Sequence, residues 1–140
     1  MTMTAIARPI GGALRHQIDV NGRHTITTDQ PERLGGSDTA PAPHKLLPAT
    51  IASCVSTMIT LYARERDWQL DDLRVDVAYE SHSTPRHVQV VVHLPDGLTP
   101  DQITRLRRVV DTCPVKRALV AGFTVDEELV VDLPATERVS

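Results

Sequence analysis

The chain has 140 residues, of which 15 are Lys or Arg and 18 are Asp or Glu, so its formal net charge is −3, and only 3% of its residues are aromatic. Charges of both signs are mixed along the chain and stacking side chains are scarce, which excludes the basic stripe and aromatic platforms of a nucleic-acid-binding protein. No basic start precedes an apolar run and no apolar stretch is long enough to cross a bilayer, so we expect a single cytoplasmic domain, residues 1–140, without a membrane partner.

The N-terminal third predicts a hairpin followed by a loop. Residues 1–13 show no clear pattern, and we expect a loose tail or an edge strand. Residues 14–28 predict a hairpin, because Asn21 and Gly22 separate two alternating segments and both residues tolerate positive φ. Residues 29–43 hold three prolines and two glycines, which predict an ordered loop without regular structure.

Residues 44–67 predict a long helix, because apolar side chains recur there every three or four residues. The recurring positions are Leu47, Ile51, Cys54, Met58, Leu61 and Tyr62. Cys54 is therefore expected on the apolar face of the helix. Pro48 falls in the first turns, so the regular helix is expected to begin near Leu47.

The next segments predict a strand pair and a capped helix. Residues 73–80 and 87–94 alternate between polar and apolar side chains, as half-buried antiparallel strands do. Thr99 and Gln102 enclose Pro100 in the pattern of a capping box, so a second helix is expected to begin there. Its predicted buried stripe consists of Ile103, Leu106, Val109 and Val110.

The C-terminal part predicts a short helix and a last strand. Pro114 cannot continue the preceding helix, so we expect a break at Cys113 and a short helix over residues 115–121, closed by Gly122. Residues 123–133 predict the final strand. The whole order is ββ-α-ββ-α-α-β, which is an α+β domain.

The two cysteines, Cys54 and Cys113, are too few for a disulfide scaffold, so their thiols are expected to start reduced. Cys113 stands just before Pro114, where unpaired helix N–H groups stabilise a thiolate, whereas Cys54 lies inside its helix and needs a cation or donor from elsewhere. Local physics therefore makes Cys113 the more acidic thiol. The alternative interpretation is that both cysteines are small core residues.

Histidine chemistry is a further alternative. The six histidines are His16, His24, His44, His82, His87 and His93. Their spacing matches no zinc motif and neither cysteine has a nearby ligand partner, so we expect neither a metal nor a cofactor. A hydrolytic or acyl-transfer site would use Cys54 with His44 or His93 as base, but no local motif or oxyanion hole supports it.

Three blocks of sequence together resemble one known family, the OsmC/Ohr proteins (osmotically inducible protein C and organic hydroperoxide resistance protein). The blocks are Gly35 to Pro43 leading into Leu46 and Leu47, then Ala52-Ser53-Cys54, and finally Cys113-Pro114-Val115. The resemblance covers residues 14–133, and the loop is most similar to the general OsmC-like branch. It implies an OsmC-like α+β fold with antiparallel strands, a long central cysteine-bearing helix, a second helical segment, and an intertwined homodimer with active sites at the interface.

The resemblance also implies an activity, that of a thiol-dependent peroxidase in the oxidative stress response. Cys54 would attack an organic hydroperoxide, or hydrogen peroxide less well, and become a sulfenic acid. Cys113 would then resolve it to a disulfide that an external dithiol reduces. The resemblance therefore makes Cys54 the reactive thiol, whereas local electrostatics make Cys113 the more acidic one. The alternative is a non-catalytic, redox-responsive or ligand-binding dimer of the same fold.

Two positions bear on the efficiency of such a site. The peroxidase members carry a glutamate where this chain has His44, which can form hydrogen bonds but not the same ion pair. The family also uses an N-terminal arginine to support the thiolate, and Arg23 is the best match here, with Arg33 as the alternative. Both could equally be solvated loop cations. We therefore expect slow peroxide turnover or a different substrate.

Overall fold

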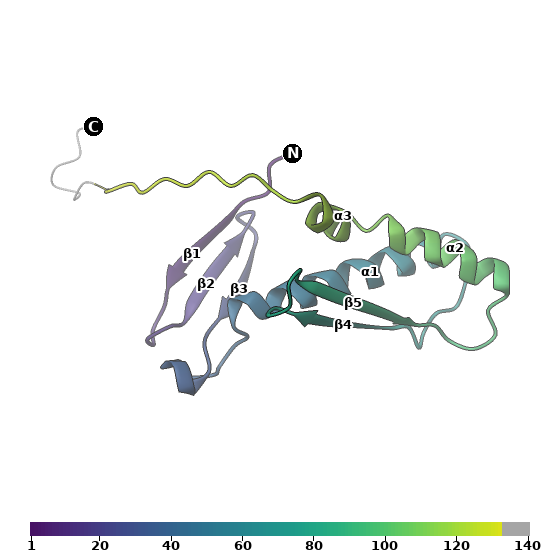
Figure 1. The fold of residues 1–140 in the computed structure, drawn as a ribbon, viewed down its shortest axis with the longest axis horizontal. Helices are drawn as coiled ribbons and strands as arrows, with labels where there is room; N and C mark the ends of the chain where they lie inside the picture. The colour runs from purple at the N-terminus through teal and green to yellow at the C-terminus, as the bar shows by residue number, and fades with distance from the viewer. Residues whose placement is uncertain (133–140) are drawn as a thin grey trace.

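The structure, a computed structural model, describes residues 1–132 (Figure 1). Its N-terminal part is a three-stranded antiparallel sheet in the order β1-β2-β3, formed by β1 (Ala5–Pro9), β2 (His16–Val20) and β3 (His24–Thr28). Asn21 and Gly22 join β2 to β3 with φ of 53° and 69°, so the predicted hairpin is confirmed. β1 arises from the segment for which the sequence allows a tail or an edge strand.

A loop with two short 3-10 helices, η1 (Glu32–Leu34) and η2 (Pro43–Lys45), leads into the long helix α1 (Leu46–Arg64). The predicted helix is confirmed, although it begins later and ends earlier than residues 44–67. It ends because Asp67 takes a left-handed conformation with φ of 56°, and the backbone N–H of Trp68 donates to the Ala63 carbonyl at 2.9 Å. This is a left-handed helix cap.

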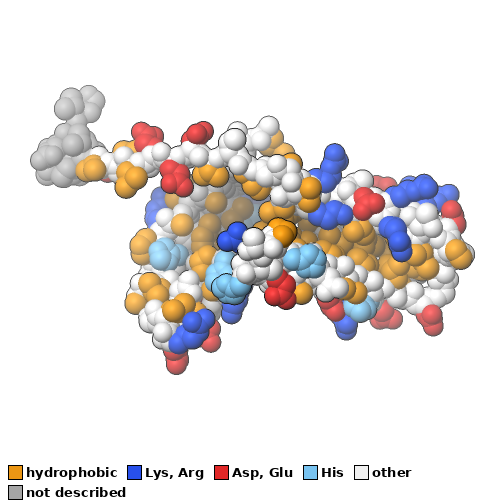
Figure 2. Space-filling model, in the orientation of Figure 1, with side chains coloured by type: hydrophobic (Ala, Val, Ile, Leu, Met, Phe, Trp, Pro, Cys, Tyr) orange, Lys and Arg blue, Asp and Glu red, His pale blue; other side chains and the backbone are white. Residues whose placement is uncertain are grey.

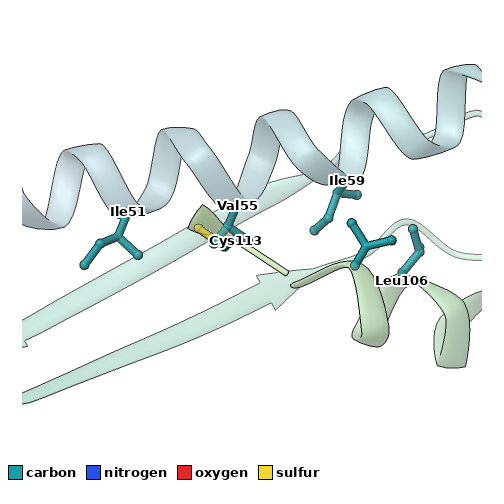
Figure 3. Packing of buried hydrophobic residues seen from close by; sticks show 6 residues of the cluster. Ile51, Val55, Ile59, Leu106 and Cys113 are labelled. Carbon is teal, nitrogen blue, oxygen red and sulfur yellow. The ribbon is translucent and has the colours of Figure 1, made fainter. Parts of the chain in front are cut away.

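The predicted apolar face of α1 is confirmed in part: Ile51 is fully buried, and Leu47, Cys54, Met58 and Tyr62 are partly buried against the same core, but the most deeply buried ridge lies to one side of this stripe. Its fully buried side chains follow a four-residue spacing, Ile51, Val55, Ile59 and Ala63, and three of them are shown in Figure 3. Leu61, expected in the stripe, is 49% exposed. At 3.6 residues per turn the two faces are about a quarter-turn apart, and the packing of α1 against β4 and α2 decides which ridge is buried.

The second sheet is the predicted antiparallel pair β4 (Arg74–Glu80) and β5 (His87–His93), and α1 packs on β4. α2 (Pro100–Asp111) follows, and both hydrogen bonds of its predicted capping box, between Thr99 and Gln102, are present. Leu106 and Val109 of the predicted stripe are buried, whereas Ile103 is 39% exposed. α3 (Pro114–Ala121) begins directly after Cys113, one residue earlier than expected, and is closed by Gly122 as expected.

The prediction of a final strand is wrong for residues 123–132, which form no strand within this chain, while Leu133 lies outside the described residues. The segment leaves α3 and extends away from the helices (Figure 1). Its large apolar side chains are exposed: Phe123, Val125, Leu129, Val130 and Val131. A strand requires a hydrogen-bonding partner, and no described strand of the same chain pairs with this segment.

By length and composition alone, residues Pro43–Arg64 form a helical stretch apolar enough to cross a membrane, with a mean hydropathy of 1.5. The core helix of a globular domain passes the same test, and α1 carries the central stripe of the core. Leu61 of α1 is nevertheless 49% exposed, so the helix has apolar surface that this single chain leaves uncovered.

Candidate active site

The two cysteines come from different helices and lie together in the core. Cys54 is in the middle of α1 and partly buried, whereas Cys113 is fully buried at the N-cap of α3. Both belong to the cluster around Ile51 and Val55. In Figure 3 the Cys113 sulfur points toward α1 beside Val55. The fold thus brings together two thiols that are 59 positions apart in sequence.

The end of α2 explains why Cys113 faces α1. The N–H and the hydroxyl of Thr112 donate to the Val109 carbonyl at 3.0 and 2.6 Å, which closes the last turn. Cys113 then adopts φ −55° and ψ 116°, and Pro114 occupies the first position of α3, where its missing N–H costs nothing. The chain turns sharply at Cys113, and α3 packs against α1.

The surroundings of Cys54 determine its acidity. Burial raises the pKa of the Cys54 thiol above its ordinary value, and hydrogen bonding with the Cys113 thiol raises it further, while the backbone N–H of Val115 lowers it. Within residues 1–132 of the single chain, no Arg, Lys or His side chain is among the groups that shift this pKa. The isolated chain therefore favours the neutral thiol of Cys54, as expected for a thiol away from cations.

Cys54 also lines an open cleft of about 420 Å³ between α1 and the first sheet. One wall is Ile26 of β3. The other wall is formed by α1 side chains, Leu46, Ala49, Thr50, Ser53 and Cys54. The cleft gives a small molecule access to Cys54, whereas Cys113 has no exposed surface. Of the two thiols, Cys54 is the one that an external substrate can reach.

The predicted supporting residues are exposed and are not among the groups that shift the pKa of Cys54 within one chain. Arg23 is exposed in the turn between β2 and β3, His44 is exposed in η2, and Arg33 is exposed in η1. None of the three lines the cleft beside Cys54. The single chain therefore brings the two thiols together but leaves Arg23 and His44 at its surface.

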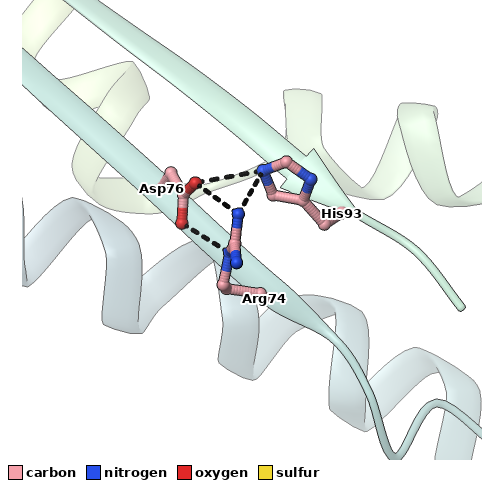
Figure 4. Close-up of polar contacts among 3 residues, drawn as sticks. All are labelled: Arg74, Asp76 and His93. Carbon is pink, nitrogen blue, oxygen red and sulfur yellow. Dashed lines mark hydrogen bonds and ion pairs between the residues drawn. The ribbon is translucent and has the colours of Figure 1, made fainter.

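His93, considered as a base for a hydrolytic site, has a different partner. Its Nε2 lies 3.0 Å from Asp76 Oδ2, and Arg74 Nε lies 3.0 Å from Asp76 Oδ1 (Figure 4). Partial desolvation raises the pKa of Asp76, but the hydrogen bonds and charges of Arg74 and His93 outweigh it, so that pKa is lowered. The exposed positions of β4 and β5 alternate with those that face α1, so His93 lies on the side of the sheet away from Cys54. This placement does not support a Cys54–His93 pair.

Asp29 is a residue that the sequence reasoning missed. Its side chain is almost fully buried and accepts several hydrogen bonds from the loop between β3 and α1. An aspartate placed before a loop rich in Pro, Gly, Ser and Thr is a usable signal, because such carboxylates cap nearby backbone N–H groups. In residues 1–132, no group of three His, Cys, Asp or Glu side chains is arranged to hold a metal ion.

Comparison with known proteins finds one matching family model and a set of similar solved structures. The family model for OsmC-like protein matches residues 35–128, a segment that includes both cysteines. No curated protein sequence matches the chain.

Among solved structures, an osmotic stress induced and detoxification response protein from Psychrobacter arcticus has a TM-score of 0.67 and 26% identity, over 84% of this chain and 87% of that one. The organic hydroperoxide resistance protein OsmC from Legionella pneumophila has a TM-score of 0.57 and 22% identity, over 85% and 89% of the two chains. An organic hydroperoxide resistance protein from Vibrio cholerae, with captopril bound in one active site, has a TM-score of 0.58 and 23% identity, over 83% of each chain.

Proposed function

The chain belongs to the OsmC-like protein family, and from this premise we propose that it is a cytoplasmic thiol peroxidase that reduces organic hydroperoxides, and hydrogen peroxide less well. The observation that carries the proposal is the placement of a cleft-lining Cys54 and a fully buried Cys113 in one core cluster, close enough for Cys113 to raise the pKa of the Cys54 thiol. The neighbours from Legionella and Vibrio, which are named for organic hydroperoxide resistance, favour the same substrate class.

The proposed cycle has three balanced steps. The Cys54 thiolate attacks the terminal peroxide oxygen, the O–O bond breaks, and the alkoxide leaves and takes up a proton to give an alcohol. Cys54 is then a sulfenic acid. The Cys113 sulfur attacks the Cys54 sulfur, the S–O bond breaks, and hydroxide leaves as water with the proton from Cys113. An external dithiol reduces the resulting disulfide by thiol exchange and is itself oxidised to a disulfide.

The first step needs a thiolate, and the single chain raises the pKa of Cys54. We therefore include a homodimer in the proposal, in which a cation of the second copy approaches the cleft. Arg23 is the best candidate because it is exposed in a turn of the first sheet, and Arg33 is the alternative. His44 would hold the arginine or the substrate by hydrogen bonding.

Uncovered surface supports the dimer. The strands β1, β2 and β3 have their extensive contacts with one another, and Ile6 of β1, Ile26 of β3 and Leu61 of α1 are exposed in the single chain. Figure 2 shows hydrophobic side chains exposed over the middle of this face and along the C-terminal segment. Apolar side chains that are exposed together on one face are typical of a protein–protein interface. A second copy would cover the sheet, the helix and residues 123–132 together.

The test is oxidation of the reduced protein with one equivalent of cumene hydroperoxide, followed by mass spectrometry. We expect an intramolecular Cys54–Cys113 disulfide in the native protein and a trappable sulfenic acid on Cys54 in Cys113→Ser. Cys54→Ser should consume no peroxide. Two unmodified thiols in the native protein, or full peroxide consumption by Cys54→Ser, would contradict the proposal.

One observation favours a second candidate, a non-catalytic dimer that responds to oxidants or binds a ligand. His44 stands where the peroxidases have a glutamate, so the arginine that supports the thiolate would lack its ion-pair partner. His44→Glu distinguishes the two candidates. A rise in peroxide turnover identifies a slow peroxidase, whereas no turnover in either protein identifies the non-catalytic dimer.

A further inference from the structure

The carboxylate of Asp29 collects the hydrogen-bond donors of one loop. Asp29 is 1% exposed and lies one residue after the end of β3. Its Oδ1 accepts from the backbone N–H groups of Gln30 at 2.8 Å and Ser37 at 3.4 Å. Its Oδ2 accepts from the backbone N–H of Thr39 at 3.1 Å and from the Thr39 hydroxyl at 2.7 Å. All these donors belong to the loop that precedes α1.

The same loop is folded back onto the end of β3 by its backbone. The N–H of Asp29 donates to the Pro41 carbonyl at 3.1 Å, and the N–H of Asp38 donates to the Gln30 carbonyl at 3.0 Å. Gly36 lies so close to Gln30 that an added Cβ would be 2.0 Å from the Gln30 carbonyl oxygen. The loop is thus held in one tight arrangement, with the Asp29 side chain at its centre.

This loop connects the two walls of the cleft beside Cys54. Ile26, on the β3 wall, is three residues before Asp29, and Leu46, the first residue on the α1 wall, is seven residues after Thr39. The strands β1, β2 and β3 have no extensive packing with α1, α2 or α3 in the described part of the chain. Within one chain, the position of Ile26 relative to α1 therefore depends on the loop and on what fixes it.

We propose that Asp29 is a positioning residue for the thiol site, whose carboxylate fixes the loop between β3 and α1 and thereby sets the width of the cleft leading to Cys54. The inference rests on the proposed function only in taking Cys54 as the reacting thiol. Asp29 itself touches neither thiol. It acts by holding Ile26 at a fixed distance from the helix that carries Cys54.

The number and type of hydrogen-bond donors explain why position 29 carries a carboxylate rather than an amide. Three N–H groups and one O–H group converge on Asp29, and an ionised carboxylate is an acceptor at both oxygens. An amide of the same shape has one acceptor oxygen and would turn its NH₂ toward N–H donors. The hydrogen bonds from Thr39 are the main reason that the pKa of Asp29 is lowered to about 2, so the carboxylate is ionised at neutral pH.

The experiment compares two maleimides that share one electrophile and differ in bulk, N-methylmaleimide and N-pyrenylmaleimide. Rates of Cys54 alkylation are measured in a Cys113→Ser background, so that a single thiol reacts. The ratio of the two rates cancels the thiolate fraction and reports the width of the cleft. In Asp29→Asn we expect the bulky reagent to gain several-fold relative to the small one, because the released loop lets the β3 wall move.

Two further variants make the result decisive. Thr39→Val removes only the hydroxyl donor and should change the ratio of the two rates in the same direction by a smaller factor. This variant also tests the inference if Asp29→Asn does not fold. Asp38→Asn is the matched control, because Asp38 is exposed, belongs to the same loop and has φ of 52°, which Asn tolerates. Its ratio should equal that of the parent.

The outcomes separate this inference from the proposed function. A folded Asp29→Asn or Thr39→Val protein with an unchanged ratio, even if less stable, overturns the inference, as does an equal change in Asp38→Asn. If the ratio shifts as expected while the native protein consumes no peroxide, the inference holds and the peroxidase proposal fails.

Discussion

Cys113 at the start of α3 and Cys54 in the middle of α1 belong to the same core cluster, close enough for Cys113 to raise the pKa of Cys54. Their contact has an electrostatic consequence. Hydrogen bonding and like charge from Cys113 both oppose ionisation of Cys54, so a peroxidatic Cys54 would react despite its neighbour. The benefit of the contact would come in the second step, where the resolving thiol is already in place.

The first prediction concerns that contact. Cys113→Ala removes both effects of Cys113, so we expect a lower pKa of Cys54 than in the native protein. The pH dependence of the rate at which iodoacetamide alkylates Cys54, resolved from Cys113 by mass spectrometry, measures it. Val115→Ala is the control, because it keeps the backbone N–H that lowers the Cys54 pKa. An unchanged or higher pKa in Cys113→Ala would show that Cys113 does not oppose ionisation.

The sequence alone predicts the features that depend on residues adjacent in the chain, but not those that depend on residues distant in sequence. The turn at Asn21 and Gly22 and the cap at Thr99 were found because each depends on a few adjacent residues. The strand predicted over residues 123–133 does not form over the described residues 123–132, because a pattern of side chains cannot supply a partner for the backbone. Periodicity likewise could not decide which ridge of α1 is buried, since that depends on elements distant in sequence.

The same limit applies to the site. The proposed roles of Cys54 and Cys113 rest on a family resemblance, because local electrostatics favour Cys113 as the more acidic thiol. Their contact depends on how α3 packs on α1, which no local pattern encodes. Asp29 was missed because its partners, Ser37 and Thr39, are eight and ten residues away in a loop without periodicity.

The second prediction concerns Gly36. Gly36→Ala places a Cβ 2.0 Å from the Gln30 carbonyl oxygen, which forces the backbone to move. Such overpacking should reduce the free energy of unfolding by about 2–3 kcal/mol. Gly35→Ala is the control: its Cβ meets no neighbour, and only the left-handed conformation at φ 92° costs about 1 kcal/mol. Urea unfolding compares the two. Equal losses would show that the close contact at Gly36 does not constrain the loop.

The third prediction is a pH dependence. The pKa of Asp29 is lowered from 3.8 to about 2, first by the hydrogen bond from the Thr39 hydroxyl. A lowered folded-state pKa means that the ionised group adds stability above pH 3.8, and this contribution is lost as the pH falls toward about 2. The difference in free energy of unfolding between the native protein and Asp29→Asn should therefore be constant near neutral pH and shrink through that window.

Chemical unfolding at a series of pH values measures this difference. Asp76, whose pKa is also lowered, is present in both proteins, so its contribution cancels. Asp38→Asn should differ from the native protein by a pH-independent amount. A gap between the native protein and Asp29→Asn that stays the same down to pH 2 would mean that Asp29 does not ionise with the lowered pKa.

The fourth prediction concerns the end of α1. Asp67 closes the helix in a left-handed conformation with φ of 56°, which glycine adopts without a Cβ penalty. Asp67→Gly should raise the free energy of unfolding by about 0.5–1 kcal/mol. Asp71→Gly removes the same charge nearby at a position without positive φ, so it should give no gain. Thermal unfolding of both variants decides: a gain in both would point to charge rather than backbone conformation.

The fifth prediction tests the dimer through the C-terminal segment. Leu129 and Val131 are 99% and 92% exposed in the single chain, so replacing both by Ser should leave the fold of one chain intact. If a second copy buries them, each side chain contributes about 1.5–3 kcal/mol per copy, and the double variant should dissociate at concentrations where the native protein is a dimer.

Sedimentation equilibrium measures the dissociation constants, and Leu34→Ser, at a 53% exposed position outside the segment, is the control. A native protein that is monomeric at micromolar concentration, or a double variant that dimerises as tightly as the native chain, would contradict the role of this segment, because no buried apolar contact would then have been lost.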